Sequence, residues 1–407
     1  MPVELGPIRN LMSRSLENLE QFAIDVILER RGGARAALLR SFLYFLSLVY
    51  ERLVQLRLFL YRKRIFRERA LGCLVISIGN LTVGGTGKTP IVEKFALALQ
   101  KGGRHVAILS RGYKSVPRPS KRGLLAKLRG DNPDPPRVVS DGKALLLDSL
   151  TAGDEPYMLA HNLKNVAVLV DKDRVKSGLF AIEKMNADTL LLDDGLQYLH
   201  LKHRLDIVLV DRQAPFGNEF LLPRGTLREP PRNLRRASYI FITKSTGESN
   251  EELIKRIRRY NRTAEIIECA HKALHLKNVV TGEVEPLEKL RGTYIGSLCA
   301  IAAPDSFEDG LRKLGAQIEI AKRYIDHHRY TDAELQSFIN RCIRRDLEMV
   351  VTTEKDAVRF PLLAKSEVPI FFLRVEIEIL SGHETWEHCV ARICKPQPML
   401  TPERFFA

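Results

Sequence analysis

A glycine-rich segment constrains the fold more than any other part of the chain. It follows an apolar run at 74–78 and leads into a helix-like stretch at 89–102. Its residues are Gly84, Gly85, Thr86, Gly87, Lys88, Thr89 and Pro90. A strand that ends in consecutive glycines lets backbone N–H groups turn toward phosphate oxygens, and the following helix presents its positive end to the same anions. The sequence therefore predicts a phosphate-binding loop between a strand and a helix.

Two side chains of this loop have specific expected roles. Lys88 would contact the β- and γ-phosphates of ATP, and the Thr89 hydroxyl would be one ligand of the Mg²⁺ that bridges them. The strict motif has a glycine where this chain has Thr82, so we expect a variant loop in which Thr82 and Val83 also line the nucleotide. A glycine-rich turn without a ligand is the alternative, which Gly-Lys-Thr at a helix start disfavours.

The composition is that of a globular protein with a basic surface. The 407 residues include 45% hydrophobic and 28% charged side chains, and this length suggests two or three domains. The net charge of +15 favours anionic partners, namely nucleic acid, an anionic membrane surface or a phosphorylated substrate. Composition alone does not choose among these three.

The cysteines indicate a reducing compartment. All six are scattered, mostly in apolar runs, as buried free thiols would be. Cys389 and Cys394 lie near His388, but no second pair of ligands stands at zinc spacing, so we expect no zinc site. The first thirty residues carry charges throughout, and we therefore expect no cleavable signal sequence.

The stretch 34–64 predicts one long helix that is rich in leucine, aromatic residues and arginine. Its uncharged run, 41–50, spans ten residues, which is about half of what a bilayer-crossing helix needs. Basic and aromatic side chains on both sides of this run favour an amphipathic helix that lies in the membrane interface. A helix buried against the rest of the protein is the alternative.

From residue 71 the pattern alternates between strands and helices. Candidate strands lie at 73–78, 105–110, 166–170, 189–193, 206–211 and 238–243. Candidate helices lie between them at 89–102, 156–164 and 174–185. This alternation predicts an α/β fold with a doubly wound, mostly parallel sheet. The segment 114–137 has no periodicity and many basic residues, and we expect an exposed, mobile loop there.

A second, smaller α/β block follows from about residue 290. Its candidate strands lie at 294–301, 317–324, 348–352 and 369–375, and its candidate helices near 306–314, 331–344 and 386–393. Residues 271–285 lack helical periodicity and suggest a strand-like connector. We therefore expect an N-terminal helical region at 1–66, a nucleotide-binding domain at 67–265, a connector at 266–289 and a C-terminal domain at 290–407.

Carboxylates follow two predicted elements. Asp193 and Asp194 end the apolar strand 189–193, where a parallel sheet places a Mg²⁺-binding acid. Two solvated aspartates in a turn are the alternative. Asp154 stands just before a predicted helix that begins near Tyr157, so it is either an N-cap or a carboxylate that accepts a hydrogen bond from an incoming hydroxyl, and both can hold at once.

Two further segments are weaker candidates. The segment 221–230 gathers two arginines and a glutamate in a proline-bounded loop that could clamp phosphate or metal. His327 is one of two adjacent histidines after a predicted strand, and it could orient or assist Asp154. From spacing alone, such a histidine pair is more often structural or a surface feature.

Taken together, these motifs resemble the tetraacyldisaccharide 4'-kinases over nearly the whole chain. The matching segments are 79–83 with the glycine loop, 110–113, 153–156, 173–174, 192–195, 222–223 with 227–230, 326–328 and 352–356. The resemblance implies a P-loop NTPase-like kinase that uses ATP and Mg²⁺ to phosphorylate the 4'-hydroxyl of a lipid A precursor. It also implies a location at the cytoplasmic face of the bacterial inner membrane, attached through the N-terminal helix.

The resemblance also assigns roles to residues. Asp154 looks like the general base and His327 like its partner, while Lys88 keeps its phosphate role. The implied metal ligands are Thr89, Asp193, Asp194 and Glu229. The implied substrate-binding residues are Arg111, Tyr113, Arg174, Gln197 and Arg228.

The chain departs from the family pattern at two places. Tyr198 stands where the family usually has a histidine, so the function of that histidine must pass to the tyrosine or be dispensable. The basic loop after Tyr113 is longer than usual. We expect a monomer that binds no nucleic acid; the alternative function is a P-loop ATPase that acts as a membrane- or protein-binding switch without a lipid acceptor.

Overall fold

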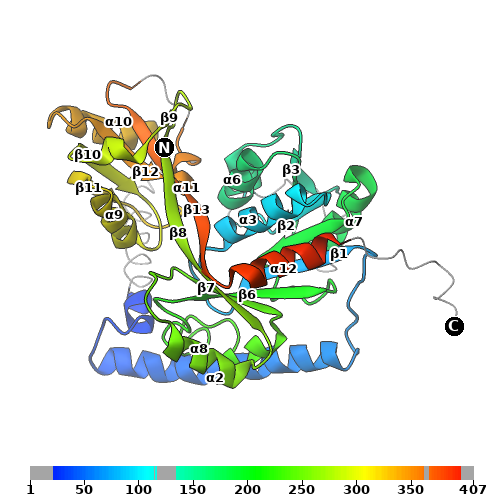
Figure 1. The fold of residues 1–407 in the computed structure, drawn as a ribbon. Helices are drawn as coiled ribbons and strands as arrows, with labels where there is room; N and C mark the ends of the chain where they lie inside the picture. The colour runs from blue at the N-terminus through cyan, green and yellow to red at the C-terminus, as the bar shows by residue number, and fades with distance from the viewer. Residues whose placement is uncertain (1–21, 114, 117–133, 362–365, 396–407) are drawn as a thin grey trace, which may run out of the picture.

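One twisted sheet runs through the whole computed structural model, which describes residues 22–113, 115–116, 134–361 and 366–395 (Figure 1). Its strands, in spatial order, are β11 (Gln317–Arg323), β10 (Tyr294–Cys299), β12 (Met349–Thr353), β13 (Ile370–Ser381), β8 (Glu265–Asn278), β7 (Tyr239–Thr243), β6 (Leu205–Asp211), β1 (Leu74–Asn80), β5 (Thr189–Asp193), β2 (Val106–Ser110), β4 (Ala167–Val170) and β3 (Arg137–Asp141). A short strand, β9 (Val284–Glu285), pairs with β8.

The half of the sheet that carries the glycine loop is mostly parallel, as predicted. Strand β1 pairs in parallel with both β5 and β6, and β7 continues the parallel order beside β6. All residues of β1 after Leu74 are buried, because helices cover both faces of a parallel sheet. The carboxyl ends of β1 and β5 therefore meet at one edge, which is where such sheets bind their ligands.

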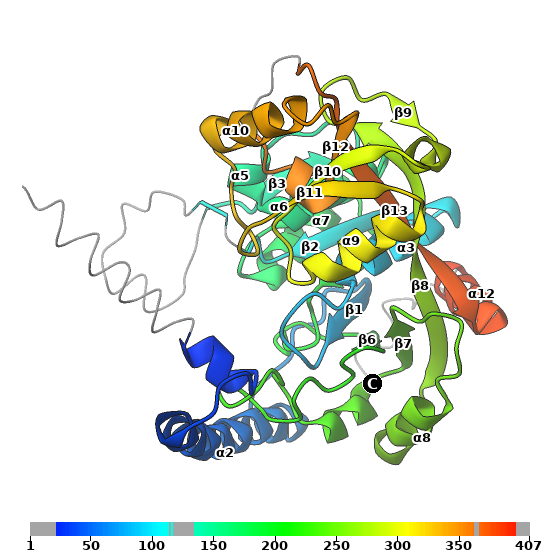
Figure 2. The same ribbon diagram turned by 90° about the vertical axis from the view of Figure 1, so that its left-hand side faces the viewer.

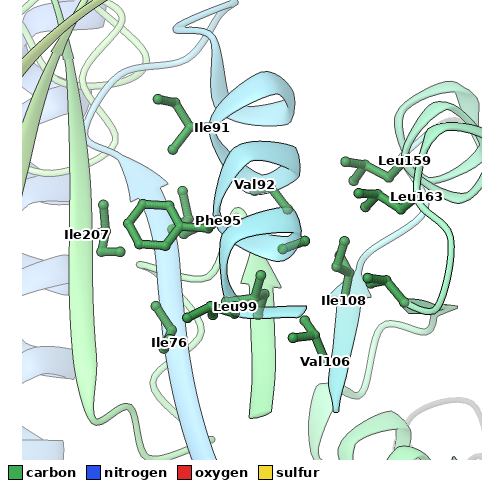
Figure 3. Packing of buried hydrophobic residues seen from close by; sticks show 14 of the residues in the cluster. Ile76, Ile91, Val92, Phe95, Leu99, Val106, Ile108, Leu159, Leu163 and Ile207 are labelled. Atoms are coloured by element: carbon green, nitrogen blue, oxygen red, sulfur yellow. The ribbon is translucent and has the colours of Figure 1, made fainter. Parts of the chain in front are cut away.

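Helix α3 (Lys88–Lys101) fills the centre of the main hydrophobic core. Phe95 points toward the side of Ile207 and Ile76, while Val92 lies on the side of the neighbouring strand β2 (Figure 3). Complete burial of a side chain such as Phe95 contributes about 1.5–3 kcal/mol relative to exposure. This packing fixes the direction of the helix whose first turn follows the glycine loop.

The predicted helix at 34–64 is confirmed as α2 (Ala34–Arg62), which lies along one end of the molecule (Figures 1 and 2). Its inner face contacts the chain near the glycine loop. The Tyr50 hydroxyl donates to the backbone oxygen of Arg228 at 3.0 Å, and Arg57 donates to the backbone oxygen of Gln197 at 3.1 Å. None of the helices in the described ranges is both long and apolar enough to cross a bilayer.

The C-terminal block lies at the opposite end of the molecule from α2 (Figure 1). It consists of β10, β11 and β12 with α9 (Pro304–Lys313) and α10 (Asp332–Ile343). The predicted strand-like segment 271–285 consists of the second part of β8, a turn and the short strand β9. Strand β8 pairs antiparallel with β13 over most of its length. These two long strands join the two halves into one sheet.

The last helix returns to the nucleotide-binding half. Helix α12 (His383–Cys394) packs on α3, with the Trp386 ring 4.6 Å from the Phe95 ring between centroids. Ile377 and Ile379 of β13 belong to the same core. Helix α12 and the end of β13 therefore complete the packing around the helix that follows the glycine loop.

Several elements were not predicted. Strand β3 forms the edge beyond β4 and pairs antiparallel with it. Short helix α5 (Ser149–Ala152), the short helix α11 (Glu354–Ala357), and helix α8 (Glu251–Tyr260) were also missed. Helix α6 (Asp154–Asn162) begins two residues before its predicted start, and α7 (Arg174–Met185) matches its predicted range. Of the predicted loop 114–137, residues 114 and 117–133 lie outside the described part of the chain.

Candidate active site

The glycine loop joins β1 to α3 with the geometry that phosphate binding requires. Gly84 and Gly87 adopt φ values of 110° and 82°, in the left-handed region that glycine tolerates best. A Cβ on Gly87 would lie 3.1 Å from the His271 ring. No side chain caps the first turn of α3, so its N–H groups face the loop ready for an anion. Thr89 and Pro90 lie in this first turn.

A neighbouring segment holds the first part of the loop. The backbone N–H of Val83 donates to the oxygen of Thr226 at 2.7 Å, and that of Arg228 donates to the oxygen of Leu81 at 2.6 Å. Thr82 pairs with Leu227 as an isolated bridge. The structure therefore explains the variant position: Thr82 lies in a strand-like pairing, where a glycine is not required.

Lys88, Asp194 and Arg228 form a charged cluster beside the loop. Arg228 binds Asp194 through two contacts, of 2.8 and 2.9 Å, and Lys88 Nζ lies 3.9 Å from the same carboxylate. Lys88 Nζ also lies 3.4 Å from Asn80 Oδ1. Although burial favours the neutral form of Asp194, the charges on Lys88 and Arg228 outweigh it and lower the pKa of Asp194. Asp194 is therefore ionised.

Asp193 has the opposite electrostatic environment. It is buried at the end of β5 and accepts a hydrogen bond from the Ser110 hydroxyl at 3.2 Å. Burial, followed by the negative charges of Glu155 and Asp194, raises the pKa of Asp193 to about 7. Lys88 and the Ser110 hydroxyl only partly offset this effect, so a bound divalent ion would stabilise the ionised form of Asp193 further.

The oxygen donors fit Mg²⁺. Within the described residues no group of three or more His, Cys, Asp or Glu side chains is arranged to hold a metal ion. Mg²⁺ is usually held by one or two carboxylates together with water and substrate phosphates, so Asp193, Asp194 and the Thr89 hydroxyl are a sufficient protein contribution.

Glu229 lies in a separate buried network. Its two oxygens accept hydrogen bonds from Arg236 at 2.8 and 2.7 Å, from Asn233 at 2.7 Å and from Gln197 at 3.1 Å. Gln197 also donates to the backbone oxygen of Asn80, which ends β1. Glu229 and Gln197 thus link the segment after Leu227 to the start of the loop, and the metal contact of Glu229 stays a prediction.

Asp154 and His327 lie side by side, although 173 residues separate them in sequence. Asp154 is the first residue of α6 and is only 6% exposed. His327 Nδ1 lies 3.1 Å from Asp154 Oδ2, while Lys355 Nζ lies 3.3 Å from the other ring nitrogen. One neutral tautomer satisfies both contacts: Nδ1–H donates to Asp154, and Nε2 accepts from Lys355.

Two arginines of the C-terminal block also bind Asp154. Arg359 Nε donates to Oδ2 at 2.8 Å, and Arg329 donates to Oδ1 at 3.1 Å. Burial favours the neutral form of Asp154, but the hydrogen bond from His327 and the charges of both arginines outweigh it and lower the pKa of Asp154. No sequence motif indicated these arginines, because only the folded chain brings residues 329 and 359 to the start of α6.

Three further residues were predicted to bind the substrate, namely Arg111, Tyr113 and Arg174. The Tyr113 ring contacts the His327 ring edge-on, with 5.4 Å between centroids. Arg174 begins α7 and is 6% exposed, with its guanidinium over the Tyr198 ring. Burial lowers the pKa of Arg174, with the nearby charge of Arg111 acting in the same direction and the acids Asp193 and Asp194 opposing it. Arg111 is exposed.

The fold and this arrangement of charges define a phosphotransferase of the P-loop class. The glycine loop has the geometry of a phosphate-binding loop, and Asp154 is a buried, ionised carboxylate of the kind that can accept a proton. Comparison with known proteins specifies the class further. The chain belongs to the family described as Tetraacyldisaccharide-1-P 4'-kinase, whose sequence profile matches residues 39–395.

Individual members of this family align with most of the chain. A Tetraacyldisaccharide 4'-kinase of Syntrophus aciditrophicus is 37% identical over 86% of this chain and 91% of its own length. One of Anaeromyxobacter sp. strain K is 37% identical over 91% of this chain and 96% of its own length. The crystal structure of LpxK from Aquifex aeolicus in complex with ATP is similar with a TM-score of 0.67 and 28% identity, covering 87% of this chain and 99% of that one.

Proposed function

We propose that this chain transfers the γ-phosphate of ATP to the 4'-hydroxyl of a tetraacylated glucosamine disaccharide 1-phosphate. One observation carries the assignment of the reacting groups. The Asp154 carboxylate is buried and held by His327 at 3.1 Å, and its neighbour Glu155 lies close enough to Asp193 to influence the protonation of that residue. This charge interaction supports placing the base on the side of the molecule that carries Asp193.

The reaction follows from these positions. Asp154 accepts the proton of the acceptor hydroxyl, the hydroxyl oxygen forms a bond to the γ-phosphorus, and the bond between this phosphorus and the β,γ-bridging oxygen of ATP breaks to leave ADP. Lys88 and the N–H groups at the start of α3 stabilise the negative charge on the transferred group. When bound, Mg²⁺ would neutralise part of the phosphate charge, and Thr89, Asp193 and Asp194 would hold it.

His327 keeps the base in place during this transfer. Its Nδ1–H donates to Asp154 Oδ2, which orients the carboxylate and favours its ionised form. Lys355 in turn faces Nε2 of His327 and lies 3.3 Å from Glu155. The imidazole is therefore held on both sides, as a partner of a general base should be.

The test supplies ATP, Mg²⁺ and the disaccharide 1-phosphate to the purified protein and follows phosphate transfer to the lipid. We expect a bisphosphorylated product, and we expect Asp154→Asn to reduce turnover sharply while ATP binding is kept. Equal ATP consumption with and without the lipid, with the lipid unmodified, would support an ATPase switch instead. Full turnover by Asp154→Asn would exclude Asp154 as the base.

We further propose that α2 attaches the protein to the membrane surface at the cytoplasmic face of the inner membrane. The face of α2 that points away from the protein exposes large apolar side chains, with Leu38 75%, Phe45 63% and Leu53 59% exposed. Arg52, Arg62 and Lys63 provide positive charge for anionic lipid headgroups. A soluble surface rarely exposes so long an apolar stripe.

Vesicle binding tests this attachment. We expect Phe45→Glu together with Leu53→Glu to reduce sedimentation with anionic phospholipid vesicles, because each places a charge on the apolar face. Val284→Glu is the matched control, since Val284 is 59% exposed on β9 and far from α2 in sequence. Equal vesicle binding by the double variant and the control would contradict the attachment through α2.

A further inference from the structure

Arg359 connects the two halves of the active site through a fully buried guanidinium. It lies two residues after α11, and its side chain is 0% exposed. On one side it contacts Asp154 of α6, and on the other it binds Asp356 at 3.0 Å and the backbone oxygen of Ala300 at 2.9 Å. Three acceptors from separate segments thus surround one rigid fork of donors.

Asp356 anchors this fork within the C-terminal block. Its Oδ2 accepts hydrogen bonds from the Thr353 hydroxyl at 2.6 Å and from the backbone N–H of Ala300 at 3.1 Å, while Oδ1 takes the contact with Arg359. Ala300 directly follows β10. The position of the guanidinium is therefore fixed by the ends of β10 and β12 rather than by the half that carries Asp154.

The two carboxylate oxygens of Asp154 have different partners. Oδ2 is shared by His327 Nδ1 at 3.1 Å and Arg359 Nε at 2.8 Å, and Arg359 Nη2 also lies 3.2 Å from His327 Nδ1. Oδ1 is contacted by Arg329, whose side chain is 36% exposed. The buried partners therefore occupy Oδ2, and the side of the carboxylate near solvent is Oδ1.

We propose that Arg359 is a positioning residue for the general base: it holds Oδ2 of Asp154 from the C-terminal block and leaves Oδ1 to receive the proton of the acceptor hydroxyl. This inference rests on Asp154 being the base, as proposed above. It also means that the base is correctly oriented only when the C-terminal block is docked on α6. Neither the phosphate loop nor the metal-binding acids contact Arg359.

The charge of Arg359 gives this role a signature in the pH profile. Besides Arg359, His327 and Arg329 contact Asp154 directly. The charged groups one contact further away are Lys355 beside His327 and Glu155, Asp326 beside Lys355, and Asp356 beside Arg359. Loss of the Arg359 charge removes a cation that favours the ionised carboxylate, so the pKa of Asp154 should rise. The acid limb of kcat/KM would then move to higher pH.

The experiment compares Arg359→Met and Arg359→Lys with the wild-type chain, using ATP, Mg²⁺ and the lipid acceptor across a range of pH. We expect Arg359→Met to lower kcat by about 100-fold, because misplacement of a catalytic group by about 1 Å has this effect, while the KM for ATP stays the same. Its acid limb should move up by about one pH unit or more. Arg359→Lys keeps the charge, so its limb should stay near that of the wild type with an intermediate kcat.

Arg323→Met is the matched control for stability. Arg323 binds the buried carboxylate of Glu308 at 2.8 Å in the same block, so its removal leaves a buried acid with only a longer contact of 3.4 Å to Arg312. We expect this control to lower thermal stability without moving the pH profile. If Arg359→Met does not fold, the intermediate kcat of Arg359→Lys decides the question.

The outcomes separate the two proposals. Asp154→Asn with full turnover would remove the base and this inference together. An inactive Asp154→Asn alongside folded Arg359→Met and Arg359→Lys that match the wild type in kcat and pH profile would overturn only the role of Arg359. A uniform loss of activity in Arg359→Met, with an unchanged pH profile and the same loss in the Arg323→Met control, would also overturn it.

Discussion

The guanidinium of Arg174 lies over the ring of Tyr198, with 4.6 Å between its central carbon and the ring centroid. The Tyr198 hydroxyl accepts a hydrogen bond from the backbone N–H of Arg174 at 3.0 Å and donates to Asp173 Oδ1 at 3.1 Å. Asp173 caps α7 through Val175 and Lys176. Tyr198 therefore supports both the start of α7 and the arginine that follows its cap.

This relationship predicts separate effects for the hydroxyl and the ring. Tyr198→Phe keeps the ring beneath Arg174, and we expect a reduction in kcat/KM of about fivefold, equivalent to about 1 kcal/mol, from loss of the hydrogen bonds. Tyr198→Ala also removes the cation–π contact and should reduce kcat/KM further. Steady-state kinetics measure both, with Tyr294→Phe on the exposed start of β10 as the control. Equal activity of all variants would contradict the support of Arg174 by Tyr198.

Gly87→Ala should weaken ATP binding more than an equally strained substitution elsewhere. Gly87 and Gly103 have nearly the same φ, 82° and 84°, so alanine is strained by about 1 kcal/mol at either position. Only at Gly87 would the new Cβ meet the His271 ring at 3.1 Å, while nothing lies within 4 Å at Gly103. Isothermal titration with ATP and Mg²⁺ measures the difference; similar affinities of Gly87→Ala and Gly103→Ala would refute it.

His271 should make the folded state less stable in mild acid. Burial, followed by the positive charge of Lys244, lowers the pKa of His271 below its usual 6.5. The unfolded chain therefore binds this proton first, and the free energy of unfolding should fall as the pH decreases below about 6.5. His271→Asn should lose less stability than the wild type between pH 8 and pH 5.5. Thermal unfolding of both chains at the two pH values measures this, and parallel losses would rule out the contribution of His271.

Arg374 should be important for stability because it binds two buried acids on opposite sides. It contacts Glu93 of α3 and binds Glu354 of α11 at 2.6 Å. Arg374→Met leaves both acids unpaired, and we expect the free energy of unfolding to fall by about 3–5 kcal/mol. Adding Glu93→Gln and Glu354→Gln should restore part of the loss. Thermal unfolding measures the series, and a triple variant no more stable than Arg374→Met would argue against unpaired charge as the cause.

Local patterns predicted the nucleotide-binding half of the fold well. The apolar strands, the glycine loop and the helix after it follow each other in sequence, so each signal lies within about ten residues of the next. The position of Asp193 and Asp194 at the carboxyl end of a strand was predicted for the same reason, because the end of a strand is a local property of the sequence. Their contact with a metal ion stays a prediction. Strand β3 was missed because its five residues follow a proline-rich stretch and form only an edge.

Contacts between distant segments could not be predicted in this way. From the residues alone, the pairing of His327 with Asp154 was one open possibility, and only the resemblance to a family assigned it. Arg359 and Arg329 were not predicted at all. Their positions depend on how β8 and β13 join the two halves, which no periodicity in either half encodes. Similarly, α8 was missed because its few apolar residues, including the buried Ile257, stand among many charges.

The packing of α12 on α3 determines when the core around Phe95 can be completed during synthesis of the chain. Trp386 covers Phe95 in the centre of the core, yet nearly three hundred residues lie between them. Until α12 leaves the ribosome, the Trp386 ring cannot cover Phe95, and we expect this side of the core to be exposed to water. A messenger truncated shortly before this helix would therefore yield a chain whose nucleotide-binding half is incomplete, although every residue of the glycine loop is present.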